Sequence, residues 1–255
     1  MIIKEYGDPR LPKVLLLHPM LADGATMLGA VASMQGRYCF IAPDLSGQGA
    51  DLAHDFVSTK QDTETLLRYL SEKDYRELAL VMGASLGAQV GMYLIADGRI
   101  RVKTAVFDGT PMHEKAWLVC SLMTRGFLAK QRKAKKMPLE RVAKVMEEMY
   151  GVCGAVMAKT LCDMSAASIR AIVHDCGYFD FPPIAPAMQA HIYLEVGSKD
   201  FNCRQNGVIL RHYPQIHLKV RQGYGHCQYL SKHSAEYGIL LEEYMHQSEG
   251  GEKQE

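Results

Sequence analysis

The sequence lacks an excess of charge of either sign, because 29 lysine and arginine residues face 28 aspartate and glutamate residues. A chain so balanced sets up no global field that would attract nucleic acid or a membrane surface. It also lacks an apolar run long enough to span a bilayer, and residues 1–13 lack the apolar core of a signal peptide. We therefore expect a small-molecule substrate as its partner, with no nucleic acid and no membrane.

The sequence contains cysteine, but the number and spacing of its cysteines do not indicate pairing. The seven cysteines are an odd number, and no two of them form a C-x-x-C pair, so neither a disulfide framework nor a zinc knuckle is indicated. No cluster with metal-ligand spacing and no phosphate-binding loop is present either. We expect a reduced, cytoplasmic chain with no metal and no cofactor. The sequence carries no signal for an oligomeric state.

The first 111 residues alternate between short apolar runs and segments with helical spacing. Runs typical of buried strands lie within residues 13–20, 38–51, 77–83 and 102–111. Strands that alternate with helices indicate βαβ units, and hence an α/β fold with a mostly parallel sheet and helices on both faces.

After residue 111 the alternation stops, and the pattern stays mostly helical until strand signals resume at 191–197 and 216–220. A last helical segment precedes a polar C-terminal stretch that is typical of disorder. The predicted organisation is therefore one core from residues 1–111 and 179–246, a helical insertion over 112–178, and a disordered tail over 247–255.

The stretch Gly83-Ala84-Ser85-Leu86-Gly87 ends one apolar run and opens a helical segment at once. Gly-x-Ser-x-Gly at a strand-to-helix turn is the pattern of a nucleophile elbow, in which strain lifts a serine hydroxyl above the carboxyl edge of the sheet. The competing interpretation is an ordinary turn leading to a small-residue helix. A serine nucleophile also needs a base and an orienting group, so the rest of the chain decides between the two.

Suitable partners follow later in the chain. Asp200 comes just after the predicted strand at 191–197, and His226 follows the strand at 216–220. The order serine, acid, histidine is the one that this architecture requires. Asp108 ends another predicted strand and is an alternative acid, so both carboxylates remain candidates.

With these residues in place, the chain resembles the α/β-hydrolase superfamily, of the serine hydrolase type with a helical cap, over nearly its whole length. The matching landmarks are VLLLHPM, IAPDLSGQGAD, GASLG, GSKD and GYGH. The resemblance implies Ser85 as nucleophile, His226 as base and Asp200 as acid. It also implies an oxyanion hole formed by the backbone N–H groups of Met20 and Leu86, and a cap formed by the insertion.

Two features depart from the family pattern. Pro19 replaces the usual glycine after the histidine, although the expected donor is the next residue. The N-terminal stretch also supplies one strand where the family often has two.

The resemblance implies hydrolysis of an ester or thioester of a small or medium acyl compound. Two alternatives remain: the same triad used for carbon–carbon bond hydrolysis or acyl transfer, and a non-catalytic binding protein on this fold. Within the insertion, Met146 and Met149 are candidates either for an apolar pocket or for core packing. The basic run Lys130 to Lys136 is most simply a solvated face of the cap; a nucleic-acid patch and weak steering of anionic substrates are its other interpretations.

Overall fold

The core of the protein is a seven-stranded sheet. The computed structural model describes residues 1–251, and the strand order is β1-β3-β2-β5-β7-β8-β9. Only β1 runs antiparallel to its neighbour within this sheet, so the prediction of a mostly parallel sheet is confirmed. The strands are β1 (Ile2–Tyr6), β2 (Lys13–Leu17), β3 (Cys39–Asp44), β5 (Leu80–Ala84), β7 (Ala105–Asp108), β8 (Ile192–Gly197) and β9 (His217–Arg221); β4 (Glu77–Leu78) and β6 (Arg101–Val102) pair separately.

The continuous apolar runs arise because helices cover both faces of the sheet. Along β2, Leu15 and Leu17 belong to one buried cluster, while Val14 and Leu16 belong to the other. Side chains alternate between the faces of a strand, so a strand covered on both sides must be apolar throughout.

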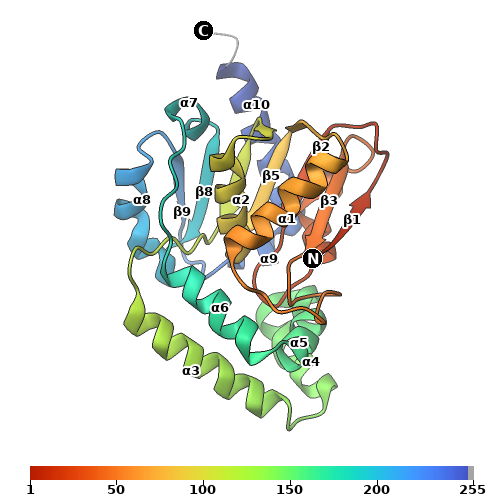
Figure 1. Cartoon of the computed structure of the whole chain (residues 1–255), viewed down its shortest axis with the longest axis vertical. Helices are drawn as coiled ribbons and strands as arrows, with labels where there is room; N and C mark the ends of the chain where they lie inside the picture. Colours follow the sequence, from red (N-terminus) through yellow and green to blue (C-terminus); the bar gives the residue numbers. More distant parts are fainter. Residues whose placement is uncertain (252–255) are drawn as a thin grey trace.

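Helices α1 (Thr59–Glu72) and α2 (Leu86–Asp97) pack side by side on one face, in front of the sheet in Figure 1. The opposite face is covered by the 3-10 segment η1 (Gly24–Met34) and by α10 (Ser234–Gly251), which pack on each other. Short helices complete the second half of the core: α7 (Pro186–Gln189), η3 (Phe201–Gln205), α8 (Asn206–His212) and α9 (Gln228–Lys232).

The helical insertion lies between β7 and β8 in the sequence and beyond the carboxyl ends of the strands in space (Figure 1). Its helix α6 lies between the sheet and α3, while α4 and α5 pack together. These elements all fall inside the predicted range 112–178: α3 (Trp117–Ala134), α4 (Leu139–Tyr150), η2 (Gly151–Cys153), α5 (Gly154–Asp163) and α6 (Ala166–Gly177).

The expected tail over 247–255 needs a correction, because α10 continues as far as Gly251. The polar composition suggested disorder, yet Ser248 is buried and its hydroxyl donates to the Tyr193 hydroxyl at 3.5 Å. Contact with the sheet therefore extends the helix. The remainder of that prediction, 252–255, lies outside the described residues.

Within residues 1–251, no helix is both long enough and apolar enough to cross a membrane. All seven cysteines are free.

Candidate active site

Ser85 occupies a strained turn between β5 and α2. Its φ is 50° and its ψ is −115°, which is unusual for a residue with a side chain. A Cβ on Gly87 would lie 2.3 Å from the Leu17 carbonyl oxygen, and one on Gly83 would lie 2.8 Å from the Cα of Ala88. Glycine is required at both positions because backbone segments approach this closely.

Ser85, His226 and Asp200 form a continuous hydrogen-bonded chain. The Ser85 Oγ lies 2.9 Å from the His226 Nε2, and the His226 Nδ1 lies 2.8 Å from the Asp200 Oδ2. An ionised carboxylate only accepts hydrogen bonds, so Nδ1 carries the proton and Nε2 is free to accept from the serine. Three residues far apart in the sequence thus meet at the carboxyl edge of the sheet, as expected from their strand-end positions.

The burial of these groups differs along the chain of hydrogen bonds. Asp200 and Ser85 are buried, whereas 45% of the His226 side chain is exposed. The carboxylate is therefore shielded from solvent, whereas part of the imidazole is open to it.

Local contacts fix the acid and the base. Asp200 caps η3, and its Oδ1 accepts from the Asn202 N–H at 3.0 Å. Gly109 lies directly beside the imidazole: a Cβ there would come within 3.0 Å of the His226 Cε1 and Nδ1. The φ of Gly109 is 62°, so its backbone also favours glycine.

The surroundings of His226 favour its charged form. Desolvation opposes the imidazolium, but the neighbouring Cys227 sulfur and the Asp200 carboxylate outweigh it and raise the pKa of His226 well above 6.5. Burial raises the pKa of the Cys227 thiol itself, although the charge of His226 acts to lower it. An imidazole held in this way accepts a proton readily.

Asp108 is the alternative acid, but the carboxylate that the His226 Nδ1 contacts is that of Asp200. Its side chain is buried, and its Oδ2 has no hydrogen-bond partner. Burial raises the pKa of Asp108 to about 7, although the charge of His226 acts to lower it. Its backbone carbonyl instead accepts from the Ser85 N–H at 2.8 Å, so β7 supports the elbow.

The two expected oxyanion donors lie on neighbouring segments. Leu86 is the first residue of α2, and the first N–H groups of a helix have no intrahelical acceptor. Met20 lies in the loop after β2, the strand that pairs with β5. In that loop the Leu21 N–H donates to the Gln48 Oε1 at 2.7 Å and the Ala22 N–H to a carbonyl.

His18 and Asp44 bind the backbone of the loops next to Met20. The His18 Nε2 accepts from the Leu45 N–H at 2.9 Å, and its Nδ1 donates to the carbonyl of Pro19 at 2.8 Å. The Asp44 carboxylate accepts from the Gly24 N–H at 2.9 Å. Both buried side chains therefore bind backbone, and burial lowers the pKa of His18.

Two polar residues near the triad carry no sequence signal. The Asn202 Nδ2 donates to the Gly109 carbonyl at 2.9 Å and lies 3.4 Å from the His226 Nδ1. The Asn202 Oδ1 accepts from the Nε2 of buried His113 at 2.9 Å. Their involvement depends on tertiary contacts, so no motif in the sequence identifies them.

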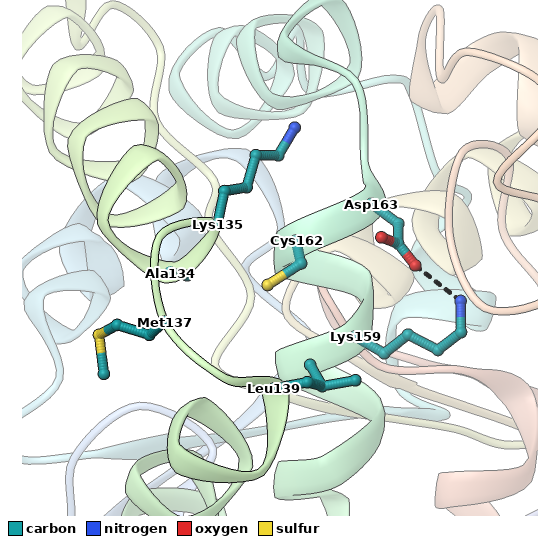
Figure 2. A pocket seen from close by; sticks show the side chains of 7 residues that line it. All are labelled: Ala134, Lys135, Met137, Leu139, Lys159, Cys162 and Asp163. Atoms are coloured by element: carbon teal, nitrogen blue, oxygen red, sulfur yellow. Dashed lines mark hydrogen bonds and ion pairs between the residues drawn. The ribbon is translucent and has the colours of Figure 1, made fainter.

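A cavity of about 580 Å³ lies in the insertion, away from the triad. Figure 2 shows it between the end of α3, the start of α4 and α5, where Lys159 pairs with Asp163 at 2.7 Å. None of the triad side chains lines it. Helix α4 instead approaches α9, which starts two residues after His226. The residues around this cavity are Ala134, Lys135, Met137, Leu139, Lys159, Cys162 and Asp163.

Across residues 1–251, no group of three or more His, Cys, Asp or Glu side chains is arranged to hold a metal ion.

No family model and no curated protein matches this sequence. Solved structures do match. An α/β hydrolase family protein from Desulfitobacterium hafniense is 19% identical with a TM-score of 0.70, and the match covers 95% of this chain and 99% of that one. A thermophilic esterase from Thermogutta terrifontis is 16% identical with a TM-score of 0.73, covering 97% and 93%. A structure from a study of carboxylesterases of Nitrososphaera gargenis is 14% identical with a TM-score of 0.72, covering 98% and 95%. The chain therefore has the α/β-hydrolase fold.

Proposed function

We propose that the protein is a serine hydrolase that cleaves an ester or thioester of a small or medium acyl compound. The observation that carries the proposal is the continuous hydrogen-bonded chain from the Ser85 Oγ through the His226 imidazole to the Asp200 carboxylate. A serine on a strained turn, a base within reach and a buried orienting acid together meet the requirements for nucleophilic catalysis. The esterases among the structural neighbours support the choice of substrate class.

In the first half of the reaction, the Ser85 oxygen attacks the substrate carbonyl carbon while His226 accepts the hydroxyl proton. The carbonyl oxygen becomes an oxyanion, which the N–H groups of Met20 and Leu86 stabilise. Each such donor contributes about 2.7–4 kcal/mol to the transition state. His226 then passes its proton to the departing alcohol or thiol, and the acyl group remains on Ser85 as an ester.

In the second half, a water molecule takes the place of the leaving group. The neutral imidazole of His226 removes a proton from this water, which attacks the acyl carbon. Collapse of the second tetrahedral intermediate releases the acid and returns the proton to the Ser85 oxygen. Throughout, the Asp200 carboxylate holds the tautomer of the base and stabilises its charged form.

The test combines a fluorophosphonate probe with a panel of esters and thioesters of varied acyl length. We expect the wild type to react with the probe and to hydrolyse part of the panel. Ser85→Ala should lose labelling, and its kcat should fall by on the order of 10⁶, as for removal of a triad nucleophile. Ser71→Ala, which changes an exposed serine on α1, is the matched control.

Each other outcome points to a different function. A folded wild type that the probe does not label would favour a non-catalytic binding protein. A labelled protein that cleaves no ester or thioester would favour carbon–carbon bond hydrolysis or acyl transfer by the same residues.

A further inference from the structure

Helix α3 presents an apolar surface to solvent at its N-terminal end. Trp117 is 67% exposed, Leu118 54% and Leu122 59%, and Met123 is also exposed. Large apolar side chains that gather on a surface usually mark an interaction site, whereas singly scattered ones do not. These four lie within seven residues of one helix.

The other end of the same helix is strongly basic. Residues 117–137 carry six positive charges and no negative charge, so the rest of this nearly neutral chain has a net charge of −5. None of the six forms an ion pair within the part of the chain that the structure describes, although Lys130 lies over the Phe127 ring. The six are Arg125, Lys130, Arg132, Lys133, Lys135 and Lys136, which include the basic run of the sequence.

Two of the exposed leucines and three of the basic residues share the outer side of α3, and Trp117 lies at the first turn beside them. The inner side packs on α6 and α5, where the buried Gln131 donates to the carbonyls of Leu161 and Met164. The opposite side carries a stripe spaced by three or four residues, which is the spacing of one helix face. In Figure 1, α3 is the part of the insertion farthest from the sheet. The stripe consists of Leu118, Leu122, Arg125, Ala129, Arg132 and Lys133.

We propose that this outer surface of α3 binds peripherally to an anionic lipid surface. The unpaired cations complement acidic headgroups, and the exposed tryptophan and leucines suit the boundary between headgroups and acyl chains. A soluble polyanion would use the charges but would leave the apolar end in water. With 18 residues, α3 is about 27 Å long, and its charged half keeps it from crossing the bilayer.

This proposal departs from the expectation of no membrane partner, which rested on the balanced charge of the whole chain. The charge is uneven along the chain: the basic excess is concentrated on one outer helix and the two lysines that follow it. The proposal is independent of the triad, so a Ser85→Ala protein should bind lipid as the wild type does.

The chain contains its own probe, because Trp117 is its single tryptophan. We expect its fluorescence emission to shift to shorter wavelength when vesicles of phosphatidylcholine with phosphatidylglycerol are added, because the indole enters an apolar boundary. Vesicles of phosphatidylcholine alone should cause no shift, and salt should reverse the shift with anionic vesicles. Unchanged emission with anionic vesicles at low salt would overturn the proposal.

Flotation with the same vesicles tests the two parts of the surface separately. Lys133→Glu with Lys136→Glu should lower partitioning by at least about tenfold, since each basic residue near an anionic surface contributes about fivefold. The matched control is Arg68→Glu with Lys219→Glu, which makes the same charge change at exposed residues outside the insertion.

The apolar part is tested by Leu118→Ser with Leu122→Ser, which should also reduce flotation. Its control is Val57→Ser with Ile239→Ser, two equally exposed positions elsewhere. All four proteins change surface residues, and their melting curves verify folding. If the leucine variant floats as well as the wild type, or if heparin binds while vesicles do not, the surface binds polyanions in general and the lipid proposal is wrong.

Discussion

Replacing Asp200 by asparagine separates the acid of the triad from its structural role. Asp200 also caps η3 by accepting from the Asn202 N–H at 3.0 Å. Asparagine is an equally good cap, so the fold should be retained. The amide, however, offers an N–H group where the His226 Nδ1 now finds an acceptor at 2.8 Å. The imidazole would then favour the tautomer with its proton on Nε2, which cannot accept from Ser85.

In serine proteases the equivalent change costs about 10⁴ in kcat, which corresponds to roughly 5 kcal/mol of transition-state stabilisation. We expect a loss of that order here, measured with the best ester of the panel, with a melting temperature close to that of the wild type. Asp108→Asn is the matched control: the same substitution at a buried carboxyl that makes no hydrogen bond to His226. It should change kcat little.

The reverse pattern, a large loss for Asp108→Asn and a small one for Asp200→Asn, would refute the assignment of the acid. Small losses in both variants, together with an inactive Ser85→Ala, would show that another group orients the base.

Three further predictions follow from the site and the insertion. The base must be neutral to accept a proton, and the pKa of His226 is raised, so kcat/KM should fall as the pH drops through an apparent pKa above 6.5. Asp200→Asn should move that midpoint to lower pH, because the carboxylate no longer stabilises the imidazolium. A midpoint that does not move would contradict the role of the carboxylate. Gly109→Ala should lower kcat by about 10², because its Cβ would displace the His226 ring, and unchanged kinetics would show that the ring has room to spare. Met146 is buried, so Met146→Ala should lower the free energy of unfolding by about 2–5 kcal/mol. Met149 is half-exposed, so Met149→Ala should alter the preference for acyl length with little change in the melting temperature. Equal effects on every substrate would mean that Met149 only packs against its neighbours.

The sequence predicts most of the triad because its signals are local. Ser85 is marked by glycines that the tight turn requires. Asp200 follows the buried strand β8 and His226 follows the edge strand β9, and the carboxyl ends of both strands lie at the same edge of the sheet. The choice between Asp200 and Asp108 is different. Asp108 is the last residue of β7, whereas Asp200 lies in the turn after the neighbouring strand β8, and the sequence does not show which carboxylate points toward the base. Only the three-dimensional structure shows that Asp200 reaches His226.

Other features are missed because tertiary contacts override the local pattern. Helix α3 does not bury its apolar residues and expose its polar ones as a sequence pattern would predict. Leu118 and Leu122 are exposed, while Gln131 is buried and donates to a backbone carbonyl. The sequence at the end of α10 is polar and predicts disorder, yet Ser248 contacts Tyr193 of the sheet. Asn202 supports the site only through contacts with residues distant in sequence.

The central claim is that Ser85 is the nucleophile, and the site of covalent modification tests it most directly. The protein is treated with a fluorophosphonate, digested, and mapped by mass spectrometry. The account predicts one adduct per chain, on the peptide that contains Ser85, and no adduct in the Ser85→Ala variant. An adduct on another residue, or full ester hydrolysis by a protein whose Ser85 stays unmodified, would contradict it.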